Sequence, residues 1–294
     1  MKYLVASGCS FTDENANHAS QSGPNFYRSL FEGNTEAPRE AEFETWVSPL
    51  AKIFGASIYN YGMNSSGNSL ISRKAIFGVS QLLKKGVDPK DILCGVEWSG
   101  PDRHDFMLES QREIDDRLLL MGKPLFKKDI HPLNRAWADK FAPGKAMWLI
   151  LNAAWADVDP FADLYYNNFF SRVGGKTNTF EKILATQHYL ESVGVKYFFT
   201  VMSEDTLLLE NDFKEDVQYL YDLIDFTKFL PIKGMYEWCR DVCLPQGMKW
   251  LERERRSIGV KHPTAEMNRM FTEQVIAPHL GVAPRIYRTR GYNT

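Results

Sequence analysis

The chain has 294 residues, of which 44% are hydrophobic and 24% are charged, a composition that fits a globular protein and excludes collagen-like and disordered classes. Its formal net charge of −2 gives no basic face of the kind that nucleic-acid binding needs, so we expect no nucleic-acid partner. No stretch approaches the roughly 18 apolar residues that cross a bilayer, so we expect no membrane contact through a spanning helix.

The cysteines and the N-terminal residues indicate the compartment. Four cysteines are too few for a disulfide framework in a chain of this length. No second cysteine pair or His-x-x-x-His pattern accompanies Cys239 and Cys243 to complete a zinc site. The segment from Met1 to Ala6 runs directly into a polar Ser-Gly-Cys segment and is too short for the apolar core of a secretory signal. We therefore expect reduced thiols, no metal and a cytoplasmic location.

The first hundred residues alternate between strand-type and helix-type patterns. The predicted strands are Lys2 to Ser7, Ser57 to Tyr61 and Asp91 to Trp98, and the predicted helices are Trp46 to Phe54 and about Ser69 to Lys85. Gly55 and Gly86 follow the two helices and supply their stops. Residues 14 to 45 are polar and predict a long surface loop.

An insertion of about residues 101–175 follows the third predicted strand. It is rich in aromatic residues, among them Trp137, Trp148, Trp155, Tyr165, Tyr166, Phe169 and Phe170. Two interpretations stay open: these side chains form a cap or a surface for a protein partner, or they pack a small core of the insertion's own.

A further helix and strand complete the predicted framework, at about Asn178 to Ser192 and at Lys196 to Met202. Strands that alternate with helices predict parallel βαβ units in one layered sheet. We therefore expect an α/β fold with a central, mostly parallel sheet, in a single domain that spans residues 1–294.

Ser10 is the first candidate for chemistry, because the segment Gly8-Cys9-Ser10-Phe11-Thr12 stands where a strand breaks into a loop. That position projects the hydroxyl from the carboxyl edge of the sheet, where open α/β sheets bind ligands. A serine hydroxyl is a poor nucleophile unless a histidine lies within hydrogen-bonding reach. Without such a partner, Ser10 is an ordinary turn residue.

The turn after the second predicted strand contains Ser65, Ser66, Gly67 and Asn68. Small residues there bring backbone N–H groups close to a ligand and can build part of an oxyanion hole. The simpler interpretation is a loop that leads into a helix, with Ser66 or Asn68 as the N-cap.

The third predicted strand also ends in a polar loop, which begins at Ser99 and contains Asp102 and Arg103. Three polar loops therefore converge at one edge of the sheet. In this loop we expect Asp102 and Arg103 to pair with each other and stiffen the backbone.

His262 is the candidate partner of Ser10. It precedes Pro263 and a helical pattern that places Met267 and Phe271 on one packing face. A proline after the histidine holds the loop extended and so aims the imidazole at a fixed point. A second His-Pro pair, His131-Pro132, lies in the insertion.

The order of these segments resembles the SGNH/GDSL hydrolases. The likeness covers about residues 1–105 and 195–282, and it is greatest to the branch with Gly-Cys-Ser-Phe-Thr starts found in phages and bacteria. It implies a three-layer α/β/α, flavodoxin-like fold with a serine nucleophile at Ser10 and a catalytic histidine at His262. It also implies an oxyanion hole from the later blocks, for which the candidates here are Ser65, Ser66, Gly67, Asn68 and Ser99.

The chain departs from the family pattern at three places. Cys9 replaces the aspartate of Gly-Asp-Ser, the third block lacks Gly-x-Asn-Asp, and Gly259 stands where an aspartate would orient the histidine. A Ser-His dyad, or a carboxylate such as Glu252 or Glu254, would have to replace that aspartate.

The resemblance implies a serine esterase or deacetylase that cleaves a small O-acyl ester, with a carbohydrate ester as one substrate class, and it needs no cofactor. The alternative is a non-catalytic binding or structural protein on the same framework, with the insertion as its partner surface and a virion location if a phage encodes it.

Overall fold

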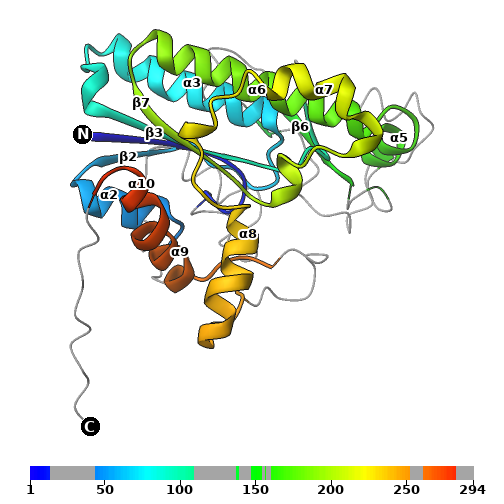
Figure 1. Ribbon diagram of the computed structural model, residues 1–294. Helices are drawn as coiled ribbons and strands as arrows, with labels where there is room; N and C mark the ends of the chain where they lie inside the picture. Colours follow the sequence, from blue (N-terminus) through cyan, green and yellow to red (C-terminus); the bar gives the residue numbers. More distant parts are fainter. Residues whose placement is uncertain are drawn as a thin grey trace.

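The computed structural model describes residues 1–13, 44–108, 137–138, 147–153, 156, 160–251 and 261–282 (Figure 1). Its central feature is a parallel sheet with the strand order β2-β1-β3-β7. The strands are β1 (Tyr3–Ser7), β2 (Ser57–Asn60), β3 (Ile92–Trp98) and β7 (Lys196–Val201). The α/β class and the parallel sheet predicted from the sequence are confirmed.

Helices cover both faces of this sheet (Figure 1). One face carries α3 (Asn68–Lys84), α6 (Arg172–Ser192) and α7 (Lys214–Tyr221). The other carries α2 (Val47–Phe54) and α9 (Ala265–Phe271). The remaining helices and helical turns are η3 (Pro89–Asp91), α5 (Pro160–Asn168), η6 (Glu204–Thr206), η7 (Asn211–Phe213), η8 (Phe226–Lys228), α8 (Met235–Trp238), η9 (Cys239–Cys243), η10 (Leu244–Gln246), η11 (Thr272–Ile276) and α10 (Ala277–His279).

The alternation of side chains along β1 explains the two layers of helices. Leu4 and Ala6 are buried in one core cluster, together with Trp46 and Phe271, whereas Val5 is buried in the other. Successive side chains of a strand point to opposite faces, so a strand that is apolar at every position needs cover on both sides.

The strand order makes the end of β1 a topological switch point. β1 pairs with β2 on one side and with β3 on the other. After β1, the chain therefore forms β2 on one side of this strand and then β3 on the other side. Open α/β sheets bind ligands at the carboxyl ends of strands where the order reverses in this way. The segment with Ser10 follows β1 directly at that point.

Gly55 ends α2 in the left-handed conformation, with φ 63°, as the sequence predicts. In contrast, α6 begins at Arg172, earlier than the predicted Asn178. Ser171 caps this end by accepting the Gly174 N–H at 3.1 Å. A Cβ on Gly175 would lie 2.5 Å from the Pro101 carbonyl, so glycine there serves close packing and does not break the helix.

A second, antiparallel sheet lies within the insertion and is missing from the sequence prediction of one sheet. Its strands, in the order β4-β6-β5, are β4 (Arg103–Leu108), β5 (Trp137–Ala138) and β6 (Met147–Asn152). Trp148 and Ile150 of β6 pack on Leu70 of α3. The strand thus buries an apolar face against a helix of the main fold, a contact that no local sequence pattern reports.

The aromatic side chains of the insertion that the structure describes pack mainly on one another. Tyr165 stacks on His104 with ring centroids 4.7 Å apart and meets Phe106 and Tyr166 edge-on. These contacts form a small aromatic cluster within the insertion, whereas Trp148 packs on α3 and Phe169 is 71% exposed. Trp155 and most of residues 109–146 lie outside the described residues.

All four cysteines are free and buried. No described helix combines the length and the apolar character that crossing a bilayer requires.

Candidate active site

Ser10 and His262 meet across the fold. Oγ of Ser10 lies 2.8 Å from Nε2 of His262, although 252 positions separate the two residues. Both side chains are 5% exposed. The ring of Phe11 meets the His262 imidazole edge-on, with centroids 5.1 Å apart, and so restricts its orientation. The arrangement has the geometry of a nucleophile and its general base.

The residues on either side of Ser10 fix the shape of the loop. A Cβ on Gly8 would lie 2.2 Å from the Thr12 hydroxyl oxygen and 3.0 Å from Cβ of Glu97, so only glycine fits. The N–H groups of Thr12 and Asp13 both donate to the Cys9 carbonyl, which closes a tight turn around Ser10. The loop is therefore rigid at the position of Ser10.

Glu97, at the end of β3, anchors this loop from below. The Thr12 hydroxyl donates to Glu97 Oε2 at 2.6 Å and accepts from the Trp46 indole N–H at 3.1 Å. Glu97 is fully buried, and burial raises the pKa of its carboxyl to about 7, while the hydrogen bond from Thr12 opposes the shift. No sequence signal points to Glu97, because one acidic residue in an apolar strand gives no distinctive pattern.

Cys9 is buried between Glu97 and Met202. Its sulfur lies 3.9 Å from Glu97 Oε2 and 3.7 Å from Sδ of Met202. Burial, reinforced by the Glu97 charge, raises the pKa of this thiol to about 11. Cys9 is therefore a packing residue beneath Ser10 and no competing nucleophile.

The turn after β2 is tied to the Ser10 loop by three hydrogen bonds. The Asn60 amide donates to the Thr12 carbonyl at 2.8 Å, and the Met63 N–H donates to the Gly8 carbonyl at 3.0 Å. The Asn64 N–H donates to Asp13 at 2.9 Å. The two polar loops converge at one edge of the sheet, as the sequence predicts.

Hydrogen bonds of Asn68 and Ser99 join the loop after β3 to the turn after β2. Asn68 Oδ1 accepts the Ser99 N–H at 2.9 Å and its amide donates to the Ser99 carbonyl at 3.0 Å, while the Ser99 hydroxyl donates to the Ser66 carbonyl at 2.8 Å. These side chains already have partners, so they position the loops and are not open donors toward a ligand.

The N–H groups of the predicted oxyanion turn differ in availability. The Ser66 N–H donates to the Met63 carbonyl at 3.2 Å, and the Gly67 N–H donates to Asp105 at 2.9 Å. Among the described residues, no acceptor is found for the N–H groups of Ser10 and Ser65, or for the buried hydroxyl of Ser66. Ser65 holds φ at +64°, a conformation that non-glycine residues rarely adopt outside functional turns.

Asp105 is a second buried carboxyl that the sequence analysis did not identify. It accepts N–H groups from Gly67 and, at 3.0 Å, from Leu70, and so caps the start of α3 from β4. Burial raises its pKa to about 6. A side chain of β4 therefore caps α3, whereas the sequence predicted Ser66 or Asn68 as the cap.

Arg103 does not pair with Asp102, so that prediction is wrong. Its buried guanidinium instead donates from Nη2 to Sδ of Met202 at 3.3 Å. The pairing fails because Arg103 begins β4, where its side chain turns toward the Ser10 loop. Trp98 packs against Phe199, in a different core cluster from that of Phe11.

Several candidate residues lie outside the described residues. They are His131, Glu252, Glu254 and Gly259. Among the residues that the structure does describe, no group of three or more His, Cys, Asp or Glu side chains could hold a metal ion.

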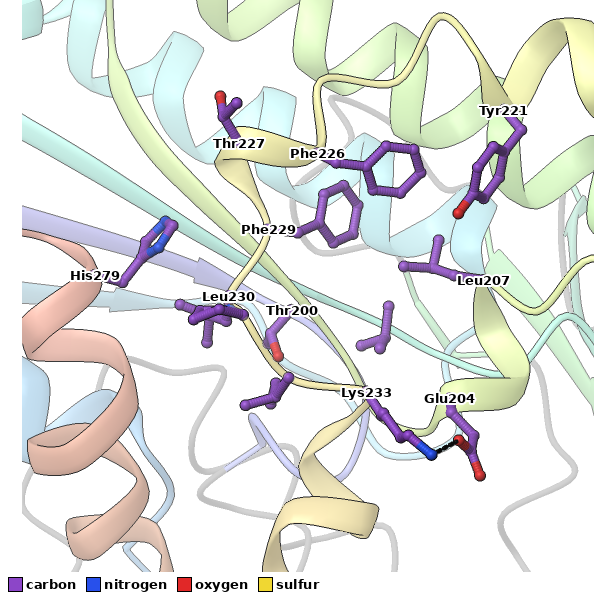
Figure 2. Close-up of a pocket in the computed structure, with 13 residues that line it drawn as sticks. Thr200, Glu204, Leu207, Tyr221, Phe226, Thr227, Phe229, Leu230, Lys233 and His279 are labelled. Atoms are coloured by element: carbon purple, nitrogen blue, oxygen red, sulfur yellow. Dashed lines mark ion pairs between the residues drawn. The ribbon is translucent and has the colours of Figure 1, made fainter.

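A separate cavity of ≈ 710 Å³ lies beyond the edge strand β7 (Figure 2). Aromatic and aliphatic side chains, including Tyr221, Phe226 and Phe229, line it, and the ion pair between Lys233 and Glu204, 3.4 Å long, stands at one end. Neither Ser10 nor His262 contributes to its wall.

The chain matches no protein-family model and no curated protein.

Proposed function

We propose that this protein is a serine hydrolase of the SGNH/GDSL type that cleaves a small O-acyl ester, with Ser10 as nucleophile and His262 as general base. The observation that carries the proposal is the 2.8 Å contact between Ser10 Oγ and His262 Nε2. The two residues come from opposite ends of the chain and meet at the switch point of the sheet, where ligands bind in open α/β folds. The helices on both faces of the parallel sheet are compatible with the three-layer architecture of that family.

The reaction follows from this geometry. Oγ of Ser10 attacks the ester carbonyl carbon while Nε2 of His262 accepts the hydroxyl proton. The carbonyl electron pair moves to oxygen and forms an oxyanion, to which the open N–H groups of Ser10 and Ser65 donate. The tetrahedral intermediate then collapses, the C–O bond to the alcohol breaks, and the alcohol takes the proton from His262. Water, activated by His262, hydrolyses the acyl-serine and restores the enzyme.

We infer that the substrate is a small acyl group on an alcohol, such as an acetylated carbohydrate. The loops around Ser10 are tied to one another by hydrogen bonds of 2.8–2.9 Å, so we expect a site that opens little to admit a long acyl chain. No step of this reaction calls for a cofactor.

A non-catalytic binding protein on the same framework is the second candidate. The observation that favours it is the burial of the pair, since Ser10 and His262 are each only 5% exposed. A serine that a substrate cannot reach would serve only to link the two ends of the chain.

A fluorophosphonate probe, which bonds covalently to reactive serine hydroxyls, separates the two candidates. We expect labelling of the wild-type protein and of Ser57→Ala, a matched variant at an exposed serine, and no labelling of Ser10→Ala. Hydrolysis of p-nitrophenyl acetate should follow the same pattern. A folded wild-type protein that neither reacts with the probe nor cleaves acetyl or butyryl esters would support the binding protein.

A further inference from the structure

The guanidinium of Arg103 is a buried cation with unused hydrogen-bond donors. The side chain is 6% exposed, and among the described residues Nη1 has no hydrogen-bond partner. Nη2 donates to a thioether, Sδ of Met202, which is a weak acceptor. Arginine offers five N–H donors in a planar fork and is rarely buried unless an anion is bound to it.

The unused donors lie next to the nucleophile loop. Sδ of Met202 is 3.3 Å from Nη2 of Arg103 and 3.7 Å from the sulfur of Cys9, the residue that precedes Ser10. One sulfur atom therefore bridges the guanidinium and the Ser10 loop. Arg103 also lowers the pKa of Cys9 against the effect of burial, as expected of a cation nearby.

Other polar groups at this edge of the sheet already have hydrogen-bond partners. Asn68 and Ser99 bind each other and the Ser66 carbonyl, and the Gly67 N–H serves Asp105. In the part of the chain that the structure describes, donors without an acceptor at this edge include the N–H groups of Ser10 and Ser65, the Ser66 hydroxyl and Nη1 of Arg103. Of these only Arg103 carries a positive charge, and charge-assisted hydrogen bonds are roughly twice as strong as neutral ones.

We propose that Nη1 of Arg103 donates a hydrogen bond to the oxyanion that forms when Ser10 attacks the ester carbonyl. This inference rests on the proposed function. In the attack the Oγ–C bond forms and the carbonyl π pair moves to the oxygen, which becomes the anion that Arg103 stabilises. In the collapse that pair reforms C=O, the bond to the alcohol breaks, and Arg103 is free again. Arg103 is then a catalytic residue, because it contacts the reacting oxygen.

A purely structural task is the rival explanation. Arg103 also lies near the buried carboxyls of Glu97 and Asp105. Burial raises the pKa of both groups, and the charge of Arg103 opposes that rise. If its charge only balanced theirs, its removal would lower stability without weakening the binding of a tetrahedral anion. The test must therefore measure both the stability of the fold and the binding of a tetrahedral anion.

Phenylboronic acid provides the probe, because its boron bonds to an active-site serine and becomes a tetrahedral anion that mimics the intermediate. The inhibition constant, kcat and KM for p-nitrophenyl acetate are measured for the wild type, Arg103→Met and Arg269→Met, an exposed arginine on α9. We expect Arg103→Met to lose on the order of 100- to 1000-fold in kcat, the usual cost of one oxyanion donor, with a similar loss in boronate affinity and a KM within about threefold. Arg269→Met should match the wild type.

Two results would overturn the inference and are distinguishable. Ser10-dependent turnover in the wild type that Arg103→Met retains within about threefold, with unchanged boronate affinity, refutes the role of Arg103 and leaves the proposed function standing. Absence of Ser10-dependent turnover in the wild type refutes the proposed function and this inference with it. If Arg103→Met does not fold, as judged by circular dichroism, Arg103→Gln is measured by the same criteria.

Discussion

Thr12 and Glu97 join the nucleophile loop to the sheet through one short hydrogen bond, 2.6 Å from the Thr12 hydroxyl to Oε2. The other oxygen of that carboxyl, Oε1, is buried with no hydrogen-bond partner. Ionising a carboxyl group that is removed from water costs free energy. The fold around the Ser10 loop is therefore most stable when Glu97 carries a proton.

Stability should therefore fall as the pH rises from 5 to 8. Burial raises the pKa of Glu97 from 4.5 to about 7 and that of Asp105 from 3.8 to about 6. For a carboxyl with a raised folded-state pKa, the stabilisation is complete below the unfolded value and is lost as the pH rises through the folded value. For Glu97 the loss is on the order of 3 kcal/mol.

The variant Glu97→Gln should weaken this dependence, because the amide imitates the neutral acid. Thermal unfolding followed by circular dichroism at several pH values measures the effect, with Glu181→Gln, at an exposed position on α6, as control. A Tm of Glu97→Gln that declines with pH as steeply as that of the wild type would contradict the assignment.

The variant His262→Ala should abolish ester hydrolysis to the level of Ser10→Ala, because each removes one member of the same hydrogen-bonded pair. The double variant should then be no worse than either single one. His131→Ala, at the other His-Pro pair, should retain activity. Inactivation by His131→Ala alone would refute the assignment of the base.

Gly67→Val should be far more damaging than Ser66→Ala. A Cβ on Gly67 would lie 2.7 Å from an Asp105 carboxylate oxygen and 2.8 Å from the Arg103 carbonyl, so valine must displace β4 from the turn. We expect a loss of kcat of at least ~100-fold for Gly67→Val and of only a few-fold for Ser66→Ala, which leaves the backbone in place. A loss of ~100-fold or more for Ser66→Ala would identify its hydroxyl as the principal oxyanion donor.

Ser65→Gly should stabilise the fold, because Ser65 holds φ at +64° at a cost that glycine does not incur. We expect a gain of about 1 kcal/mol in the free energy of unfolding by urea, with kcat retained because the N–H group is unchanged. Ser80→Gly, in the interior of α3, should instead lose up to about 1 kcal/mol. A Ser65→Gly variant no more stable than the wild type would show that the turn is unstrained.

The sequence suffices to predict the framework because its signals are local. The apolar run of β1 and the glycine after α2 each report the structure of their own segment, and the convergence of the loops follows from the parallel order of the strands. The pairing of Ser10 with His262 was implied by the resemblance to the SGNH/GDSL hydrolases, and the structure places Ser10 Oγ 2.8 Å from His262 Nε2.

The residues that the sequence did not reveal act through distant partners. Asp105 caps a helix that begins 37 positions earlier in the chain, and β6 finds its apolar partner on α3. Arg103 was predicted to bind its neighbour Asp102, yet its donors face Met202, 99 positions away. A pattern read along the chain cannot report contacts that only the tertiary fold creates.

The separation of 252 positions between Ser10 and His262 also makes their contact a late event in folding. Closing so long a loop carries an entropic penalty that local helices avoid, and contacts of high sequence separation slow folding. During refolding from denaturant, helical circular dichroism should therefore recover before reactivity toward a fluorophosphonate. If Ser10 is the nucleophile that we propose, it becomes reactive only after both ends of the chain have docked, and its reactivity then reports on the completed fold.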